Sequence, residues 1–142
     1  MGGQRYCVSG FLISGILMGC NSSPEVPPGT GARECVQAYY EALIQNDWPR
    51  AYTALDYESQ KRCSSQQFGR LAQSYRAQLG FEPRAVLVRA CEEHDTDATA
   101  HVILTGQSAA KEHRYKDAIA LRRGDKDWRV ALPKDFGRTK KR

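Results

Sequence analysis

The sequence lacks most of the short motifs that mark an enzyme of recognisable chemistry. It has no glycine-rich loop of the kind that cradles phosphate groups and no serine at a nucleophile elbow. Its five cysteines show no Cys-x-x-Cys spacing, so neither a redox pair nor a zinc site is expected. With 142 residues the chain is also too short for a multi-domain enzyme, since single domains usually span about 100–200 residues.

Histidine is scarce as well, with three residues at positions 94, 101 and 113. The densest group of metal-ligating side chains is Cys91-Glu92-Glu93-His94-Asp95, which is expected at the end of a strand. Neighbouring residues of an extended strand point to opposite faces, whereas a metal site needs three or four convergent ligands. We therefore expect no metal and no other cofactor.

The chain also has no apolar run long enough for a membrane-spanning helix, which takes about 20 residues. Residues 6–18 form a shorter, largely apolar run that follows Arg5 and leads into Gly19 and Cys20. A positive start, a short apolar stretch and a small residue before the cut are the parts of a signal peptide. The sequence therefore predicts a signal peptide over residues 1–19.

The end of this segment, Leu17-Met18-Gly19-Cys20, resembles the lipobox of bacterial lipoproteins. The resemblance implies that Cys20 is lipidated, that the mature chain starts there, and that the bilayer is the partner of its acyl chains. A secreted chain without lipid is the alternative. Lipidation places the domain outside the cytoplasm in the bacterial cell envelope, and Asn21, where Asp is the familiar inner-membrane retention signal, slightly favours the outer membrane.

Two further segments flank the expected domain. Residues 20–31 are rich in Pro, Gly and Ser and predict a flexible tether, whereas residues 134–142 predict a basic tail. The net charge is +5, but without Arg5 and the four basic residues after 137 the chain has 16 basic and 16 acidic residues. A nucleic-acid partner is not expected, because the tail has no interleaved aromatic residues and the export signal excludes it from the cytoplasm. Contact of the tail with anionic lipid is the expectation that fits an envelope protein.

The intervening residues 32–133 show the periodicities of one α+β domain. Helical spacing of apolar residues predicts three helices, over residues 32–46, 47–55 and 64–79. Runs rich in β-formers predict four strands, over residues 85–91, 98–105, 115–122 and 128–132. Tight turns at 95–97 and 124–126 and a longer loop at 106–112 make these strands antiparallel neighbours. We expect N-terminal helices packed on one face of a four-stranded antiparallel meander.

Several motifs of this domain together resemble the nuclear-transport-factor-2-like superfamily. They are a helix with Tyr39-Tyr40, then Asn46-Asp47-Trp48 and Ala51-Tyr52-Thr53-Ala54-Leu55, and a final turn before Trp128-Arg129-Val130. The resemblance implies a cone-shaped domain over residues 32–133, in which a curved sheet wraps around a long helix. The superfamily includes isomerases, dehydratases, transport factors and non-catalytic domains of lipoproteins, so the fold alone does not assign an activity.

The enzymes of this superfamily place a carboxylate and a tyrosine or second acid inside the cone. Asp117 is a candidate because strand alternation places it on one face with Ile119 and Leu121, and Asp56 is another. The competing interpretation is that Asp56 caps a helix and that Asp117 pairs with a basic neighbour, Lys116 or Arg122, at the start of its strand. No catalytic residue is therefore assigned.

The function that we expect is non-catalytic binding of a small apolar ligand or of a protein partner. The candidate pocket residues are Tyr39, Tyr40, Tyr52, Tyr75, Asp117 and Trp128. The alternative is an isomerase- or dehydratase-like enzyme that uses a pocket Asp and Tyr. A homodimer formed through the open face of the sheet is a further expectation.

The cysteines outside the signal and the lipidation site are Cys35, Cys63 and Cys91. Their odd number in a compartment that permits disulfides allows one bridge and one free thiol. The sequence favours a bridge between Cys35 and Cys63, with Cys63 to Cys91 as the alternative, and burial as small apolar side chains is the default.

Overall fold

The computed structural model describes residues 29–139, in which four helices precede four strands. The helices are α1 (Ala32–Ile44), α2 (Trp48–Thr53), α3 (Tyr57–Arg62) and α4 (Ser65–Gln78). The strands are β1 (Pro83–His94), β2 (Asp97–Ser108), β3 (Lys111–Arg123) and β4 (Trp128–Ala131). They form one antiparallel sheet in the order β1-β2-β3-β4, so the predicted α+β meander is confirmed.

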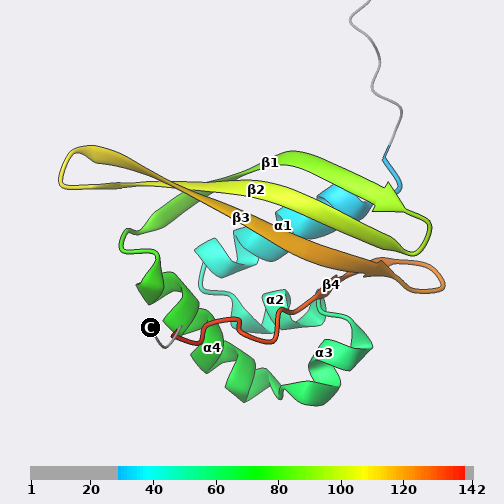
Figure 1. The fold of residues 1–142 in the computed structure, drawn as a ribbon. Helices are drawn as coiled ribbons and strands as arrows, with labels where there is room; N and C mark the ends of the chain where they lie inside the picture. Colours follow the sequence, from blue (N-terminus) through cyan, green and yellow to red (C-terminus); the bar gives the residue numbers. More distant parts are fainter. Residues whose placement is uncertain (1–28, 140–142) are drawn as a thin grey trace, which may run out of the picture.

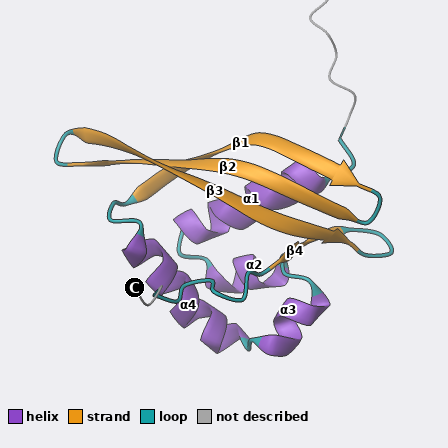
Figure 2. Ribbon diagram, in the orientation of Figure 1, coloured by secondary structure: helices purple, strands orange, loops and turns teal. Residues whose placement is uncertain are grey.

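The helices all lie on one side of a curved, twisted sheet (Figure 1). Helix α1 packs directly against the sheet and contacts β1, β2 and β4, and α2, α3 and α4 lie beyond it (Figure 2). The core between these layers consists of α1 side chains such as Val36, Tyr40 and Leu43 and of strand side chains such as Val102 and Leu121, all nearly inaccessible. This burial of one sheet face and one helix face is what stabilises the cone.

The predicted helix signals that depend on capping are confirmed. Asp47 accepts a hydrogen bond from the Arg50 amide at 3.2 Å at the start of α2. Ser64 and Gln67 form a capping box at the start of α4, with bonds of 3.2 and 3.0 Å. Gly80 follows α4 with a φ of 75°, the left-handed conformation that commonly ends a helix.

Helix α3 was not predicted. Its six residues are mostly polar and exposed, and Ser59 is its one buried residue, so no apolar stripe marks it in the sequence. The helix is fixed instead by polar contacts: the Asp56 carboxylate accepts a hydrogen bond from the Ser59 amide at 2.9 Å. The Ser59 hydroxyl in turn accepts a hydrogen bond from the Leu132 amide at 2.9 Å. The interpretation of Asp56 as a helix cap is therefore confirmed.

The prediction of a longer loop over residues 106–112 is wrong. Strands β2 and β3 extend to Ser108 and from Lys111 and are joined by Ala109 and Ala110, with φ values of 48° and 62°. Turns with two left-handed residues usually contain Asn or Gly, so an Ala-Ala turn leaves no signal in the sequence. Gly106 lies within β2, paired with His113, and a side chain there would overlap the backbone of Glu82, next to a shift of register in β1.

The folded part continues past residue 133, where the predicted domain ended. Phe136 is buried and stacks on Phe68 and Tyr75, with ring centroids 5.8 and 5.0 Å apart. The Gly137 carbonyl accepts hydrogen bonds from Ser74 at 2.6 Å and from Gln78 at 3.1 Å. Residues 132–138, which we call the C-terminal segment, therefore pack along α4 and belong to the domain.

The described chain begins and ends on different parts of the molecule. Thr30 donates a hydrogen bond to Glu93 near the end of β1, whereas the C-terminal segment ends beside α4 (Figure 1). The predicted signal peptide, Cys20 and most of the tether lie outside the described residues, as does the end of the basic tail. Among the helices of residues 29–139, none is long and apolar enough to cross a membrane.

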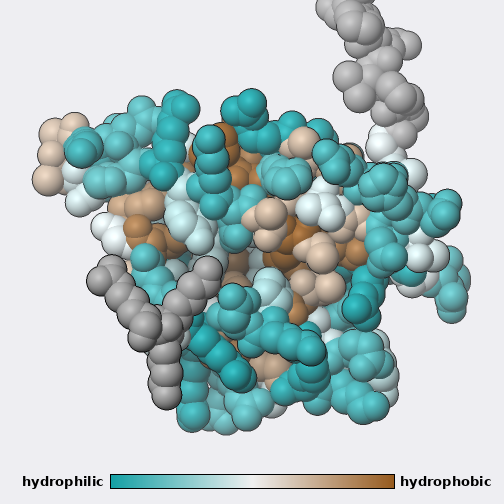
Figure 3. Space-filling view, viewed as in Figure 1, coloured by the Kyte–Doolittle hydropathy of each residue, from teal (hydrophilic) through white to brown (hydrophobic). Residues whose placement is uncertain are grey.

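The surface is largely hydrophilic on the face seen in Figure 3. Hydrophobic side chains gather near the middle of this face, between the sheet and the helical layer, where the surface is hollowed (Figure 3). A hollow with apolar side chains at the boundary between the two layers is the kind of surface that binds ligands.

Candidate functional site

A carboxylate on the inner face of the sheet holds two tyrosines from different helices. Asp117 Oδ2 on β3 accepts a hydrogen bond from Tyr40 Oη on α1 at 2.9 Å and one from Tyr75 Oη on α4 at 2.8 Å. The other oxygen, Oδ1, accepts a bond from the Ala118 amide at 2.9 Å. Three of the six predicted pocket residues are thus brought together at one point.

The positions of these three residues follow from the periodicities in the sequence. Tyr40 lies on the buried face of α1 with Val36 and Leu43, one helical turn away in each direction. Asp117 shares its strand face with the buried Ile119, as alternation predicted. The expected pairing of Asp117 with Lys116 or Arg122 is absent from the ion pairs of the described residues, and Arg122 contacts Asp56 instead, at 3.7 Å.

Burial and the nearby charge of Asp117 strongly raise the pKa values of the tyrosine hydroxyl groups. Burial raises the pKa of Tyr40 and of Tyr75 well above 10, and the Asp117 carboxylate raises both further. Burial also raises the pKa of Tyr39, with a smaller contribution from Asp117. All three phenols therefore stay protonated across the physiological range, and Tyr40 and Tyr75 act as hydrogen-bond donors to the carboxylate.

Tyr39 lies behind this cluster but does not bind the carboxylate. Its ring packs edge-on against Tyr40, with centroids 5.3 Å apart and planes at 82°. Its hydroxyl is buried without a hydrogen-bond partner among the residues that the structure describes. Tyr39 is therefore a core residue next to the site rather than part of its polar group.

The cluster borders a cavity of about 500 Å³ at the mouth of the cone. Its lining combines Asp117 and Tyr75 with Leu79, Tyr115 and Phe136. Tyr115 precedes Asp117 on the same face of β3 and is 40% exposed, so it stands at the opening. Asp135 and Arg138 of the C-terminal segment also line the cavity. The volume is in the range of small-molecule sites.

Two predicted pocket residues lie elsewhere. Tyr52 Oη donates hydrogen bonds to the backbone carbonyl of Cys63 at 2.8 Å and of Gln60 at 3.2 Å, which ties α2 to the end of α3. Trp128 Nε1 donates to Thr30 at 2.8 Å, at the start of the described chain. Neither side chain lines the Asp117 cavity, and both serve to join segments of the fold.

The site also contains a residue that the sequence did not suggest. Phe136 forms part of the cavity wall, but it stands alone among charged residues after a proline and carries no periodic signal. Strand alternation also puts Tyr115 on the face of Asp117, yet nothing in the sequence distinguishes an exposed tyrosine there from a buried one. Both become recognisable only when β3 and the C-terminal segment are placed together.

The three cysteines of the described chain are free thiols, and neither expected bridge is present. Cys35 Sγ donates to the Trp128 carbonyl at 3.3 Å, and Cys63 Sγ lies 3.5 Å from the Ser64 carbonyl. Burial raises the pKa of Cys35 to about 11 and also raises the pKa of Cys63 and Cys91. Within residues 29–139, no group of three or more His, Cys, Asp or Glu converges as metal ligands.

Comparison with known proteins identifies the fold. No family model matches the sequence, and neither does any curated protein. A SEC-C motif-containing protein from Rhodopseudomonas palustris has a TM-score of 0.55, with 13% identity over 74% of this chain and 79% of its own. A candidate nuclear-transport-factor-2-like transpeptidase from Campylobacter jejuni has a TM-score of 0.56, with 12% identity over 70% of this chain and 96% of its own.

This chain therefore has the nuclear-transport-factor-2-like cone fold, as its sequence motifs predicted. At 12–13% identity the likeness concerns the fold alone, and the function has to be argued from the site.

Proposed function

We propose that this protein is a lipid-anchored envelope protein whose cone domain binds a small ligand, without catalysis, in the cavity beside Asp117. The observation that carries the proposal is the carboxylate itself, which is half-buried next to a cavity and held rigidly by Tyr40 and Tyr75. A polar group fixed by two neighbours and bordered by apolar side chains is the usual composition of a binding pocket.

The lining indicates the chemistry of the ligand. Leu79, Tyr115 and Phe136 offer apolar and aromatic surface to an apolar body. The Asp117 carboxylate accepts hydrogen bonds and is held in place by its tyrosines, so it favours an N–H or O–H donor on that body. The proposed ligand is therefore a small, mainly apolar molecule with at least one donor group, neutral or cationic.

The arrangement favours binding over catalysis. Both phenols donate to Asp117 and keep their protons because their pKa values are raised, so neither is free to donate to a bound substrate. Two hydrogen bonds reach Oδ2 of this carboxylate and one reaches Oδ1, so an acceptor position on Oδ1 is left for a donor group of the ligand. These contacts are those of a preorganised recognition group.

Native mass spectrometry of the full chain purified from its own host tests this proposal. A reproducible small-molecule adduct is expected in the wild type and is expected to disappear in Asp117→Asn and in Tyr115→Ala. Tyr57→Ala is the matched control, because Tyr57 is 73% exposed and does not line the cavity. An adduct that persists in Asp117→Asn, or a host-purified protein with no adduct, contradicts the proposed site.

The same measurement distinguishes the other hypotheses. An adduct of protein size would indicate a protein partner instead of a small ligand. An enzyme of the isomerase or dehydratase type is the second candidate, and the observation that favours it is the contact of one carboxylate with two phenols inside the cone. It predicts that the released ligand is converted on incubation with wild-type protein and that Asp117→Asn abolishes this conversion.

The anchor rests on the lipobox-like residues 17–20 and has its own test. The membrane-extracted protein is expected to begin at Cys20 and to carry the mass of acyl chains, and Cys20→Ala is expected to remain unprocessed. Fractionation of the two membranes then tests the outer-membrane location. A soluble protein that retains Met1 contradicts the anchor but leaves the proposed ligand site untouched.

A further inference from the structure

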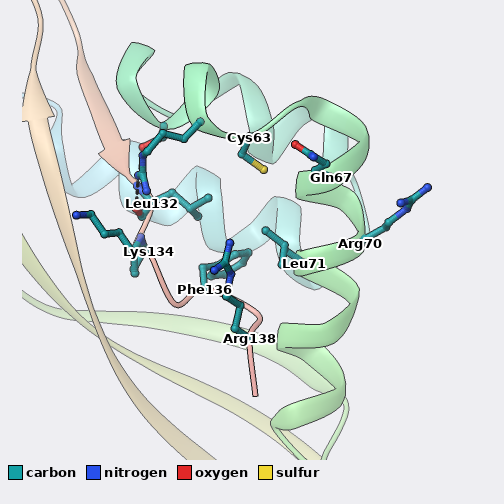
Figure 4. A pocket seen from close by; sticks show the side chains of 11 residues that line it. Cys63, Gln67, Arg70, Leu71, Leu132, Lys134, Phe136 and Arg138 are labelled. Atoms are coloured by element: carbon teal, nitrogen blue, oxygen red, sulfur yellow. Dashed lines mark hydrogen bonds between the residues drawn. The ribbon is translucent and has the colours of Figure 1, made fainter. Parts of the chain in front are cut away.

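A second cavity, also of about 500 Å³, lies on the other side of the C-terminal segment from the Asp117 site. It is formed between α3, α4 and the C-terminal segment (Figure 4). Its floor is apolar, with Leu71 from α4, Leu132 and Phe136 from the C-terminal segment, and the Cys63 thiol at the junction of α3 and α4. In Figure 4 these four side chains point toward one another across the cavity.

The polar lining of this cavity carries one sign of charge. Four basic residues line it, Arg62, Arg70, Lys134 and Arg138, and no carboxylate does. None of the four forms an ion pair with an acidic residue of the described chain, whereas five other arginines do. Unpaired positive charges around an apolar floor are an uncommon arrangement in a domain that is otherwise neutral.

Two of these basic side chains, Arg62 and Arg138, lie next to the apolar floor of the cavity. Arg62 is held in place because its Nη2 donates to the Leu132 carbonyl at 2.9 Å, and its remaining donors stay available. The Arg138 side chain lies beside Phe136, whereas Arg70 points away from the cavity (Figure 4). Burial raises the pKa of the Cys63 thiol, and the positive charges of Arg62 and Arg138 lower it by a smaller amount. Both charges therefore lie close enough to Cys63 to interact with it.

We propose that this cavity, the basic groove, binds a free medium-chain fatty carboxylate, with its head between Arg62 and Arg138 and its chain over Leu71, Leu132 and Phe136. Guanidinium groups match the planar geometry of a carboxylate, and an alkyl chain covers the apolar floor. The cavity volume suits a chain of about ten carbons. The Asp117 cavity has two carboxylates in its lining, Asp117 and Asp135, against the single cation Arg138, so it disfavours the same ligand.

Titration of the full chain with decanoate in detergent-free buffer tests the proposal. Saturable one-to-one binding is expected, with affinity reduced about tenfold in Arg138→Gln and in Arg62→Gln. Arg89→Gln is the matched control, since this exposed arginine of β1 lines neither cavity. Acetate, which lacks the chain, and decyltrimethylammonium, which reverses the charge, are expected to bind at least tenfold more weakly than decanoate.

A second readout locates the ligand. Bound decanoate is expected to slow the alkylation of Cys63 in proportion to occupancy, which mass spectrometry measures on the peptide of residues 63–70, and to leave the alkylation of Cys35 unchanged. Because Arg62 also supports the Leu132 backbone, the exposed Arg138 provides the decisive variant if Arg62→Gln does not fold.

Several results overturn the proposal. One is that decyltrimethylammonium binds as tightly as decanoate. Another is that Arg89→Gln and Arg138→Gln lose the same amount of decanoate affinity. A third is that saturating decanoate does not slow the alkylation of Cys63. Binding to phosphatidylglycerol vesicles without binding of monomeric decanoate would assign the groove to a membrane surface instead. Unchanged decanoate affinity in Asp117→Asn is expected and separates this site from the one proposed above.

Discussion

Tyr75 on α4 and Asp117 on β3 are joined by a hydrogen bond of 2.8 Å between residues 42 positions apart. This bond links the helical layer to the sheet at the mouth of the cone, and Tyr40 makes the same link from α1 at 2.9 Å. Hydrogen bonds to a charged group in a partly buried site are stronger than those between neutral groups. The cluster therefore contributes to the stability of the cone as well as to the shape of the pocket.

Removal of one phenol oxygen is expected to destabilise the protein. Tyr75→Phe should lower the free energy of unfolding by about 1.5–3 kcal/mol, because it removes a hydrogen bond to a carboxylate and keeps the ring. Urea denaturation with circular dichroism measures the change. Tyr57→Phe, at an exposed position, should stay within about 0.5 kcal/mol of the wild type.

Asp117 and Tyr75 are also expected to be coupled. In a double-mutant cycle, the loss in the double variant Tyr75→Phe, Asp117→Asn should be smaller than the sum of the two single losses, because both remove the same bond. Additive losses would show that the two side chains stabilise the fold independently, contrary to the contact at 2.8 Å.

The buried tyrosines predict a loss of stability at alkaline pH. The pKa of Tyr39, Tyr40 and Tyr75 is raised in the folded protein above the value of 10 of an unfolded chain. Their contribution is fully present below pH 10 and is lost as the pH rises toward the folded pKa values, because the unfolded chain releases protons first. Each tyrosine should then lower the free energy of unfolding by about 1.4 kcal/mol per pH unit.

Urea unfolding at pH 8, 10 and 11 measures this effect. The free energy of unfolding of the wild type should fall steeply above pH 10. In Tyr75→Phe it should fall less steeply, by the contribution of one tyrosine to the pH dependence. A free energy of unfolding that is constant from pH 8 to 11 would mean that the phenols titrate alike in both states, and so would contradict their burial.

The sequence predicted those parts of the fold that carry periodic or local signals. Alternation placed Asp117 and Ile119 on one face, and the spacing of Ser64 and Gln67 placed the start of α4, because both signals depend on neighbouring residues. The short helix α3 gave no such signal, since polar contacts of Asp56 and Ser59 fix it. The Ala109-Ala110 turn was missed because tertiary pairing imposes a conformation that alanine does not favour.

The candidate site was predictable only as a set of residue types. The sequence listed buried tyrosines and an inward-facing aspartate, but which of them meet depends on how α1 and α4 lie against β3. That arrangement brings Tyr40 and Tyr75 to Asp117 and leaves Tyr52 and Trp128 elsewhere. The basic groove was less visible still, because its cations come from three separate segments of a neutral domain.

Asp56 is expected to act as a helix cap, and its variants distinguish a cap from a functional acid. Asp56→Ala should cost about 1–2 kcal/mol, because the Ser59 amide loses its acceptor, whereas Asp56→Asn should retain most of the stability. Thermal unfolding measures both. Ligand binding at the Asp117 cavity should be the same in the wild type and in Asp56→Asn, and a loss of binding in that variant would assign Asp56 a role in the site.

The thiols of the described chain predict slow chemistry at neutral pH. The pKa of Cys35 is raised to about 11, so little thiolate is present near pH 7 and alkylation should be much slower than that of a free cysteine. Without reductant, mass spectrometry of the unfolded protein should find one alkyl group on each of Cys35, Cys63 and Cys91. If two of the three cysteines carry no alkyl group, and the protein before alkylation is lighter by two hydrogen atoms, one of the disulfides that the cysteine count favoured is present.

The C-terminal segment is expected to be required for the stability of the cone. Phe136→Ala should lower the free energy of unfolding by about 3 kcal/mol, because it removes a buried ring that stacks on Phe68 and Tyr75. Gly137→Ala should also destabilise the protein. The left-handed φ of 66° disfavours a side chain there, and a Cβ would overlap the Leu71 carbonyl.

Chemical denaturation of both variants tests this requirement, with Lys134→Ala as a control, since the exposed Lys134 should change stability by no more than about 0.5 kcal/mol. The two cavities share Phe136 as a wall, so Phe136→Ala should weaken ligand binding at both sites, whereas Asp117→Asn and Arg62→Gln should each affect one. Wild-type stability in Phe136→Ala would mean that the segment is detached in solution. Neither cavity would then have the wall that its proposed ligand needs.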